Sequence, residues 1–176
     1  SESLEQSLER LEYSKPNAPE KIIVTYVPVE QGDWFITSEE ILEFDGIEKD
    51  ICLLAQTIYG EARGLSVYEM SLVAWCIMNR VDDPAFPITL EEVIKQPNQF
   101  SGYKADYPIE KTCYEVAKDV ILRYNLEKQT SWSVGRTLPE GYLYFYGKNG
   151  HNWFRKEIGL PGRWNFTEIL KSPYEE

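Results

Sequence analysis

Glu61 is the residue whose sequence context best suits it to acid–base chemistry. It follows four apolar residues, Ile51, Leu54, Ala55 and Ile58, whose i, i+3, i+4, i+7 spacing predicts an amphipathic helix. At about 100° per residue, Glu61 falls on the same side as these residues, at the end of the buried stripe. Burial disfavours the charged form of a carboxyl, so we expect a raised pKa and a proton that is retained towards neutral pH.

Helix-ending signals surround this glutamate. Gly60 and Gly64 bracket the point where the helix is expected to end, because glycine readily adopts the left-handed conformation found there. Asp50 has a side chain suited to an N-cap, which predicts a helix over residues 51–61. Periodicity alone leaves a second interpretation open, in which Glu61 is a solvated side chain at a frayed helix end.

Three further helices are predicted downstream. They are expected over residues 66–80, 90–95 and 109–124, where apolar residues recur at helical spacing. Ser66 is a suitable N-cap for the first of them, and Thr89 begins a capping box for the second.

Residues after 130 have a different pattern. Aromatic segments at 143–146 and 153–156 flank the dipeptide Asn149-Gly150, a strong signal for the turn of a β-hairpin. The chain is therefore predicted to have an α+β fold, mainly α, with a small β-hairpin lobe.

The chain is predicted to divide into two parts. Residues 1–47 are expected to be an N-terminal extension and linker, because a short leucine-bearing helical pattern is followed by a Pro-rich stretch at 14–20 and a β-branched run at 22–27. Residues 48–176 are expected to be the main domain, which contains Glu61.

Composition narrows the classes of function. Acidic residues number 29 against 18 basic ones, for a net charge of -11, and the basic residues do not cluster, so nucleic acid is not an expected partner. There is no apolar run long enough for a membrane span, and Ser1-Glu2-Ser3 do not resemble the start of a signal peptide.

The three cysteines, Cys52, Cys76 and Cys113, form no C-x-x-C pair. We therefore expect buried free thiols, no metal site and no cofactor.

Four motifs in order resemble one known family. Residues 54–64, LAQTIYGEARG, resemble the Y-x-E-A-R-G signature of the SleB-type cell-wall hydrolases, the spore cortex-lytic enzyme family. Residues 73–81 (VAWCIMNRV), 84–87 (PAFP) and 93–101 (VIKQPNQFS) match further motifs of that family, whereas the hairpin region is similar only in kind.

The resemblance implies a lysozyme-like fold and cleavage of the glycan strand of peptidoglycan, mainly as a lytic transglycosylase. Its catalytic glutamate lies in the E-A-R-G motif, which here is Glu61. A transglycosylase acts at the MurNAc–GlcNAc bond and forms 1,6-anhydro-MurNAc, so it needs no second carboxylate. None with a comparable apolar setting is visible, because Asp82 and Asp83 precede Pro84 and are interpreted as turn caps.

Candidate substrate-binding residues combine amide, aromatic and imidazole groups suited to sugars: Tyr59, Gln99, Phe100, Tyr103, Tyr144, Tyr146 and His151. For several of these residues a purely structural role remains open. The loop that contains Phe100 could be a polar surface loop with the ring in the core, the hairpin aromatics could form a core face, and His151 could be an exposed turn residue.

The chain departs from the family pattern at Leu65, commonly acidic in the family, and at Glu69-Met70-Ser71, where the family has E-G-Q. These departures motivate an alternative function, a non-catalytic peptidoglycan-binding module. A hydrolytic muramidase and an assembly part of a phage or spore apparatus also stay open. We expect a monomer that is extracellular or associated with the cell wall or spore; a phage-derived origin is a further possibility.

Overall fold

The computed structural model describes residues 47–97, 99–100, 102–129, 133–157 and 173–174. The predicted N-terminal extension therefore lies outside the described residues, apart from Ile47, and the proposed domain boundary stays a prediction.

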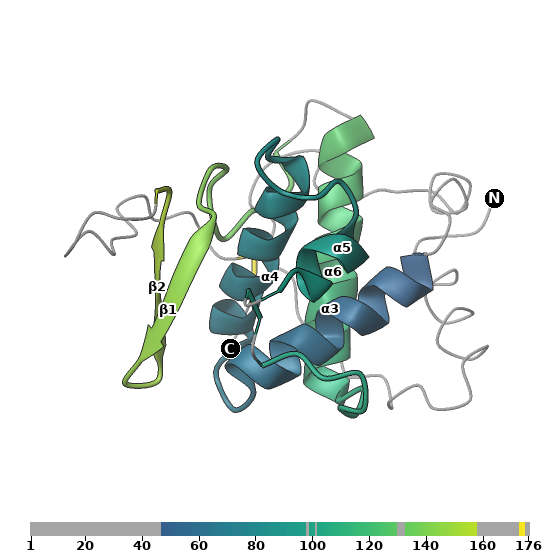
Figure 1. Cartoon of the computed structure of the whole chain (residues 1–176), viewed down its shortest axis with the longest axis vertical. Helices are drawn as coiled ribbons and strands as arrows, with labels where there is room; N and C mark the ends of the chain where they lie inside the picture. The colour runs from purple at the N-terminus through teal and green to yellow at the C-terminus, as the bar shows by residue number, and fades with distance from the viewer. Residues whose placement is uncertain (1–46, 98, 101, 130–132, 158–172, 175–176) are drawn as a thin grey trace.

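Four helices and one hairpin make up the described part of the chain (Figure 1): α3 (Ile47–Ala62), α4 (Val67–Asp82), α5 (Leu90–Lys95), α6 (Lys111–Gln129), β1 (Tyr144–Lys148) and β2 (His151–Arg155). This composition confirms the prediction of an α+β fold that is mainly α. The two strands form one antiparallel sheet.

Local capping explains where two helices begin. The Ser66 side chain accepts a hydrogen bond from the backbone N–H of Glu69, and the Thr89 side chain accepts one from the N–H of Glu92, as the sequence predicted. The prediction for Asp50 was wrong. Helix α3 begins at Ile47, so Asp50 lies in its first turn, where a carboxylate still interacts favourably with the helix dipole.

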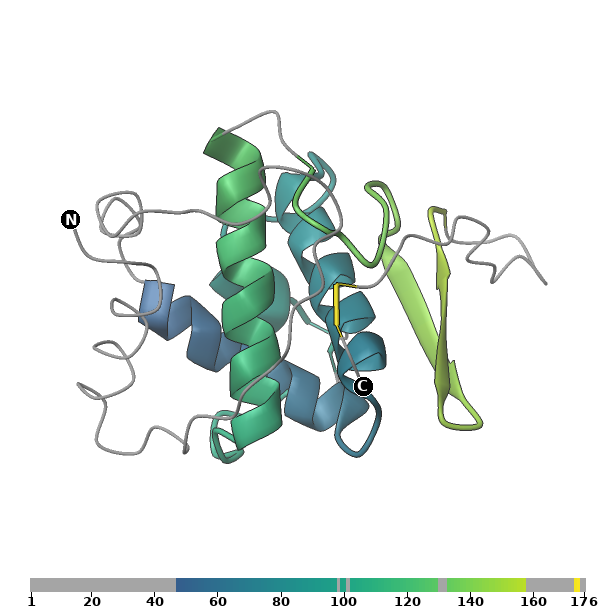
Figure 2. The ribbon, with the colours of Figure 1, turned by 180° about the vertical axis from the view of Figure 1, so that it is seen from behind.

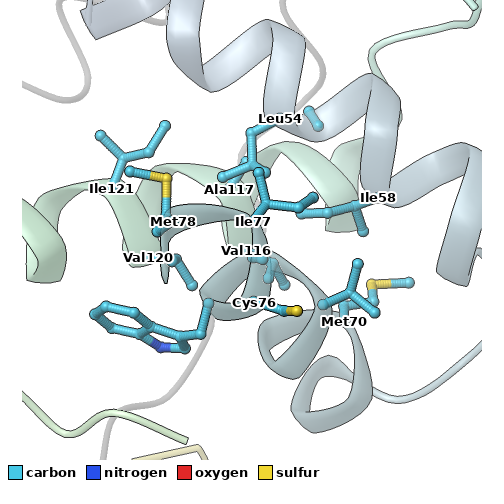
Figure 3. Packing of buried hydrophobic residues seen from close by; sticks show 14 of the residues in the cluster. Leu54, Ile58, Met70, Cys76, Ile77, Met78, Val116, Ala117, Val120 and Ile121 are labelled. Carbon is cyan, nitrogen blue, oxygen red and sulfur yellow. The ribbon is translucent and has the colours of Figure 1, made fainter. Parts of the chain in front are cut away.

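The core lies where α3 and α4 pack against α6. Figures 1 and 2 show α4 alongside α6, with α3 crossing them and the hairpin on the far side of α4. Figure 3 shows side chains of all three helices meeting in this core, among them Leu54, Ile58, Ile77, Val116 and Val120, which are completely buried. The apolar stripe predicted for α3 therefore faces this core, and Glu61 lies at its C-terminal end.

Buried polar contacts attach the segment before the hairpin to the helices. Asn79 of α4 donates from its amide to the backbone carbonyls of Pro139 and Tyr142, both at 3.0 Å. Arg136 donates to the Asn79 amide oxygen and forms an ion pair with Glu127 of α6 at 2.7 Å. These contacts fix the approach of β1 to α4.

The hairpin turn is the one predicted. Asn149 and Gly150 both have positive φ angles, 56° and 72°, as a two-residue type I′ turn requires. Phe154 is completely buried, whereas Trp153, on the opposite face of the strand, is 43% exposed. The hairpin therefore packs one face on the domain and leaves aromatic side chains on the other.

All three cysteines are free and buried, as predicted. None of the described helices is long and apolar enough to cross a membrane.

Two isoleucines provide a matched test of this core. Ile51 is 0% exposed and Ile88 is 83% exposed. We expect Ile51→Ala to lower the free energy of unfolding by about 2–5 kcal/mol, because it leaves a cavity, and Ile88→Ala to change it by less than about 0.5 kcal/mol. Urea unfolding of both variants measures the difference; equal effects would contradict the packing described here.

Candidate functional site

Glu61 lies in the last turn of α3, at the edge of the core. The helix ends one residue later, at Ala62, where the Leu65 N–H donates to the Ala62 carbonyl at 3.1 Å and Gly64 has a φ of 80°. Gly64 therefore follows the helix end in the left-handed conformation, as one of the two predicted glycine signals indicated. Gly60 is not a helix-ending residue, because it lies within the helix.

Gly60 has a different role, which is a close approach between two backbones. A Cβ atom on Gly60 would lie 1.9 Å from the carbonyl oxygen of Gly102, and one on Gly102 would lie 2.8 Å from a Glu61 carboxylate oxygen. Only glycine fits at either position. Their contact seats the loop around Gly102 against the end of α3, and the Gly102 N–H donates to Glu61 Oε1 at 3.1 Å.

Arg80 of α4 lies behind this loop and holds it from the other side. Its side chain is buried and donates from Nε to the Leu143 carbonyl at 2.7 Å and from Nη1 to the Gln99 amide oxygen at 3.1 Å. The guanidinium also lies over the ring of Phe100, 4.7 Å from its centre. One buried cation thus connects α4 with Gln99 and Phe100 and with Leu143, the residue before β1.

The pKa of Glu61 is raised above its ordinary value of 4.5. The main cause is desolvation by burial, and the Gly102 N–H and the positive charge of Arg80 act in the opposite direction but do not cancel it. Such a carboxyl keeps its proton at a higher pH than an exposed glutamate does and can return to the charged form beside a fixed cation. These are the properties of a general acid that later acts as a base.

A cleft of about 300 Å³ lies between the end of α3 and the hairpin turn, and its lining residues are Glu61, Ala62, Arg63, Leu65, Gly147, Asn149, Gly150, His151 and Asn152. The structure therefore brings Glu61 and His151, two of the predicted site residues, to one cleft. The other predicted residues are not among those that line it.

The loop residues of the predicted site surround Arg80 instead. Phe100 is 7% exposed and packs on Phe145, 6.1 Å between ring centres, so its ring lies in the core. Gln99 is exposed, but its amide oxygen accepts the hydrogen bond from Arg80. Tyr103 is half-buried against the core.

The hairpin tyrosines differ from one another. Tyr144 is partly buried beside Phe86, 6.1 Å between ring centres, and lies under the Arg80 guanidinium. Tyr146 is 49% exposed and pairs across the hairpin with Trp153. Contact of the hairpin with a sugar therefore stays a prediction for Tyr146 and its neighbour Trp153. Tyr144 is less accessible to a sugar because it is partly buried.

One contact at the cleft was not predicted. His151 Nδ1 lies 2.5 Å from Glu69 Oε1, and the Asn152 N–H donates to Glu69 Oε2 at 3.4 Å. The side chain of Glu69 is only 13% exposed. The Ser66-x-x-Glu69 spacing is a sequence signal for a capping box, but here the carboxylate reaches across to the hairpin instead of to its own N-cap.

Arg63 lines the cleft on the side of α3, opposite His151 and the hairpin turn. Its guanidinium lies over the Tyr59 ring, 4.8 Å from the centre, and near the Tyr107 ring at 5.7 Å. The predicted site residue Tyr59 therefore supports a cleft residue without lining the cleft itself. In the described part of the chain, no group of three His, Cys, Asp or Glu side chains could hold a metal ion.

Sequence comparison identifies the family. The sequence profile of the cell wall hydrolase family matches residues 66–160, which is more than half of the chain. The chain belongs to the cell wall hydrolase family. This confirms the family to which the motifs pointed. Glu61 precedes the matched range, so the match leaves its role as a prediction.

Named relatives agree with this family. The spore cortex-lytic enzyme of Bacillus subtilis (strain 168) is 40% identical over 123 residues, which cover 68% of this chain and 37% of that protein. The spore cortex-lytic enzyme of Oceanobacillus iheyensis is 30% identical over 126 residues, 69% of this chain and 42% of that protein. The chain thus spans about two fifths of the length of these relatives.

Among solved structures, the catalytic domain of the Bacillus cereus SleB protein is similar with a TM-score of 0.46 and 25% identity, over 72% of this chain and 87% of that one. The catalytic domain of the germination-specific lytic transglycosylase SleB from Bacillus anthracis has a TM-score of 0.42 and 29% identity, over 55% of this chain and 72% of that one.

The contact between the two glycines can be tested by Gly60→Ala. Alanine favours a helix by about 0.5–1 kcal/mol, but its Cβ overlaps the Gly102 carbonyl, so we expect a net loss of about 1–3 kcal/mol in the free energy of unfolding. The displaced loop also withdraws the Gly102 N–H from Glu61. Because the hydrogen bond from this N–H lowers the Glu61 pKa, its loss should raise that pKa further.

Urea unfolding and carbon NMR titration of the Glu61 carboxyl measure the two effects. Gly141→Ala is the control, because Gly141 does not line the cleft, its Cβ would meet only the Lys156 side chain at 3.8 Å, and its φ of 84° is unfavourable for alanine. The control variant should lower the free energy of unfolding and leave the Glu61 titration unchanged. An unchanged titration in Gly60→Ala would contradict the role assigned to the contact.

The raised pKa of Glu61 also makes stability depend on pH. The folded chain holds this proton more tightly than the unfolded chain, so the contribution is fully present below the ordinary pKa of 4.5 and is lost as the pH rises through the folded value. Glu61→Gln carries no charge to desolvate and keeps an acceptor for the Gly102 N–H. We therefore expect it to be more stable than the parent chain at pH 7, with the gain disappearing below about pH 4.5.

Thermal unfolding between pH 4 and pH 8 measures this gain. Glu140→Gln removes the same charge from an exposed position and corrects for the change in net charge. A Glu61→Gln variant that gained no more at pH 7 than Glu140→Gln would show that desolvation does not act on Glu61.

Proposed function

We propose that this domain cleaves the glycan strand of peptidoglycan as a lytic transglycosylase, at the MurNAc–GlcNAc bond, with Glu61 as general acid and base. The observation that carries the proposal is a half-buried carboxyl with a raised pKa on the wall of a cleft. Family membership supports the substrate class, and the motif resemblance of residues 54–64 implies the type of reaction.

In the first step, protonated Glu61 donates its proton to the glycosidic oxygen, and the bond from that oxygen to C1 of MurNAc breaks. Positive charge develops on C1 and the ring oxygen. The new Glu61 carboxylate lies next to this charge and stabilises it, while the buried charge of Arg80 favours the carboxylate over the acid.

In the second step, the 6-hydroxyl of the same MurNAc attacks C1 and closes a 1,6-anhydro ring, and Glu61 takes the proton released by that hydroxyl. The glutamate is then protonated again for the next cycle. One carboxyl suffices for both steps. This agrees with a cleft in which Glu61 is the sole carboxylate among the described lining residues.

Gly102 and Arg80 act as positioning residues in this scheme. The Gly102 N–H holds Oε1, so Oε2 is the oxygen left to meet the substrate. Arg80 holds the loop through Gln99 and does not line the cleft. The site therefore keeps the carboxyl oriented without surrounding it with donors that would lower its pKa further.

The same family membership supports a proposal for the place of action. The named relatives are spore cortex-lytic enzymes, and we propose that this chain acts on peptidoglycan of the spore cortex or the cell wall, outside the cell or associated with the spore. Residues 48–176 form the proposed catalytic domain, and residues 1–47 form the proposed extension.

Two alternatives rest on specific observations. A hydrolytic muramidase would need a second group to activate water, and Glu69 with His151 beside the cleft is the candidate. A non-catalytic peptidoglycan-binding module is favoured by Leu65, which lines the cleft at a position commonly acidic in the family.

Mass spectrometry of fragments released from purified peptidoglycan tests the proposal. The parent chain should release fragments with 1,6-anhydro-muramyl ends, and Glu61→Gln, which cannot donate the proton, should release at least about 100-fold less. Vegetative wall and spore cortex serve as parallel substrates.

Other products separate the alternatives. Reducing ends that vanish in Glu61→Gln would mean a hydrolase with the same acid. Retention on peptidoglycan without fragments from either protein would favour the binding module. Full activity of Glu61→Gln would exclude Glu61 as the catalytic residue.

A further inference from the structure

Arg63 is a cleft residue that the proposed reaction does not use. It lines the cleft together with Glu61, and its side chain is exposed. The cation whose charge lowers the Glu61 pKa is Arg80, which lies behind the loop. The positive charge of Arg63 therefore has no evident part in tuning the acid.

The guanidinium of Arg63 is held in place by two aromatic rings. Tyr59 and Tyr107 meet edge to face, 5.1 Å between centres, and Arg63 lies 4.8 Å and 5.7 Å from the two centres. Gln56 secures the second ring, because its amide donates to the carbonyls of Ala105 at 3.0 Å and Tyr107 at 2.9 Å. The arginine is thus supported by one ring of α3 and one ring of the segment before α6.

Stacking of this kind leaves the hydrogen-bond donors of arginine available. A ring contacts the flat face of the guanidinium, whereas the N–H groups point outward in its plane, in the fork that matches a carboxylate. Among the described residues, no carboxylate forms an ion pair with Arg63. Lys104 adds a second positive charge nearby, 5.6 Å from the centre of the Tyr107 ring.

The two walls of the cleft differ in charge. Arg63 lines the α3 side, and His151 lines the hairpin side, where its imidazole contacts Glu69 of α4, a residue outside the lining. An anionic group on the substrate would meet an unpaired cation on the first side and an imidazole that already contacts a carboxylate on the second. The whole chain has a net charge of -11, so the positive charge of Arg63 is opposite in sign to the charge of the protein as a whole.

We propose that Arg63, which lies over Tyr59 and near Tyr107, binds a substrate carboxylate and thereby selects muramic acid for the ring cleaved at Glu61. This rests on the proposed function, because it takes peptidoglycan as the substrate. MurNAc differs from GlcNAc by a lactyl group on O3, which ends in a carboxylate when free and in a stem peptide when substituted. Both forms supply the chemistry that a stacked arginine recognises.

Binding measurements in the Glu61→Gln background test this assignment without turnover. Four ligands are compared: a GlcNAc oligomer without carboxylates, a peptide-free glycan with free lactyl carboxylates, a glycan with stem peptides, and the same glycan with its peptide carboxylates amidated. We expect the carboxylate-bearing glycans to bind more tightly than the GlcNAc oligomer, and adding Arg63→Gln to remove about tenfold or more of that preference.

The pattern across the ligands identifies the carboxylate. A preference for the peptide-free glycan means the lactyl group, and a preference that amidation abolishes means the stem peptide. Arg63→Lys keeps the charge but lacks the fork, so it should recover only part of the affinity. Lys156→Gln is the matched control, because Lys156 is another exposed cation over a tyrosine ring, 5.1 Å from the centre of Tyr142, away from the cleft, and it should change nothing.

Equal affinity of the Arg63 and Arg63→Gln proteins for every glycan would overturn this assignment while leaving the proposed reaction intact. Binding of no glycan at all would overturn both. Cleavage that survives Glu61→Gln would reject the proposed acid, yet a carboxylate preference that depends on Arg63 would still stand.

Discussion

The close contact between Gly60 and Gly102 is the constraint on which the site depends. Two backbone segments more than 40 residues apart in the sequence touch without any side chain between them, and a Cβ on Gly60 would lie 1.9 Å from the Gly102 carbonyl oxygen. This contact brings a backbone N–H to Glu61 and covers one side of its carboxyl. The acid is consequently desolvated by backbone, which cannot swing away as a side chain could.

Arg80 is the second group that holds the segments around Glu61 in place. A buried guanidinium is costly unless its donors are satisfied, and Arg80 meets this requirement with the Leu143 carbonyl and the Gln99 amide oxygen. Those partners belong to the hairpin and the loop, so satisfying one cation also fixes two segments that border the site. Its charge reaches Glu61 through the protein interior and moderates the effect of burial without reversing it.

Local signals in the sequence predicted much of the fold because their causes are local. Ser66, Thr89 and Asn149-Gly150 each act through hydrogen bonds or φ angles within a few residues, and each is found as predicted. Asp50 was misassigned because α3 begins a turn earlier. The role of Gly60 and the pairing of Glu69 with His151 could not be predicted, since each depends on a partner brought close by the tertiary fold and periodicity reports only which face is buried.

The charge of the whole chain and the charge of the cleft lead to different expectations. A net charge of -11 predicts repulsion from an anionic wall, but screening limits that effect to about 8–10 Å at physiological ionic strength. At the cleft, the groups that matter are Glu61, Arg63 and the Glu69–His151 pair. A neutral, protonated Glu61 between a cation and a paired carboxylate presents little net negative charge to a glycan. An acidic protein can therefore carry a cleft that accepts an anionic polymer, provided that the acid keeps its proton until the bond breaks.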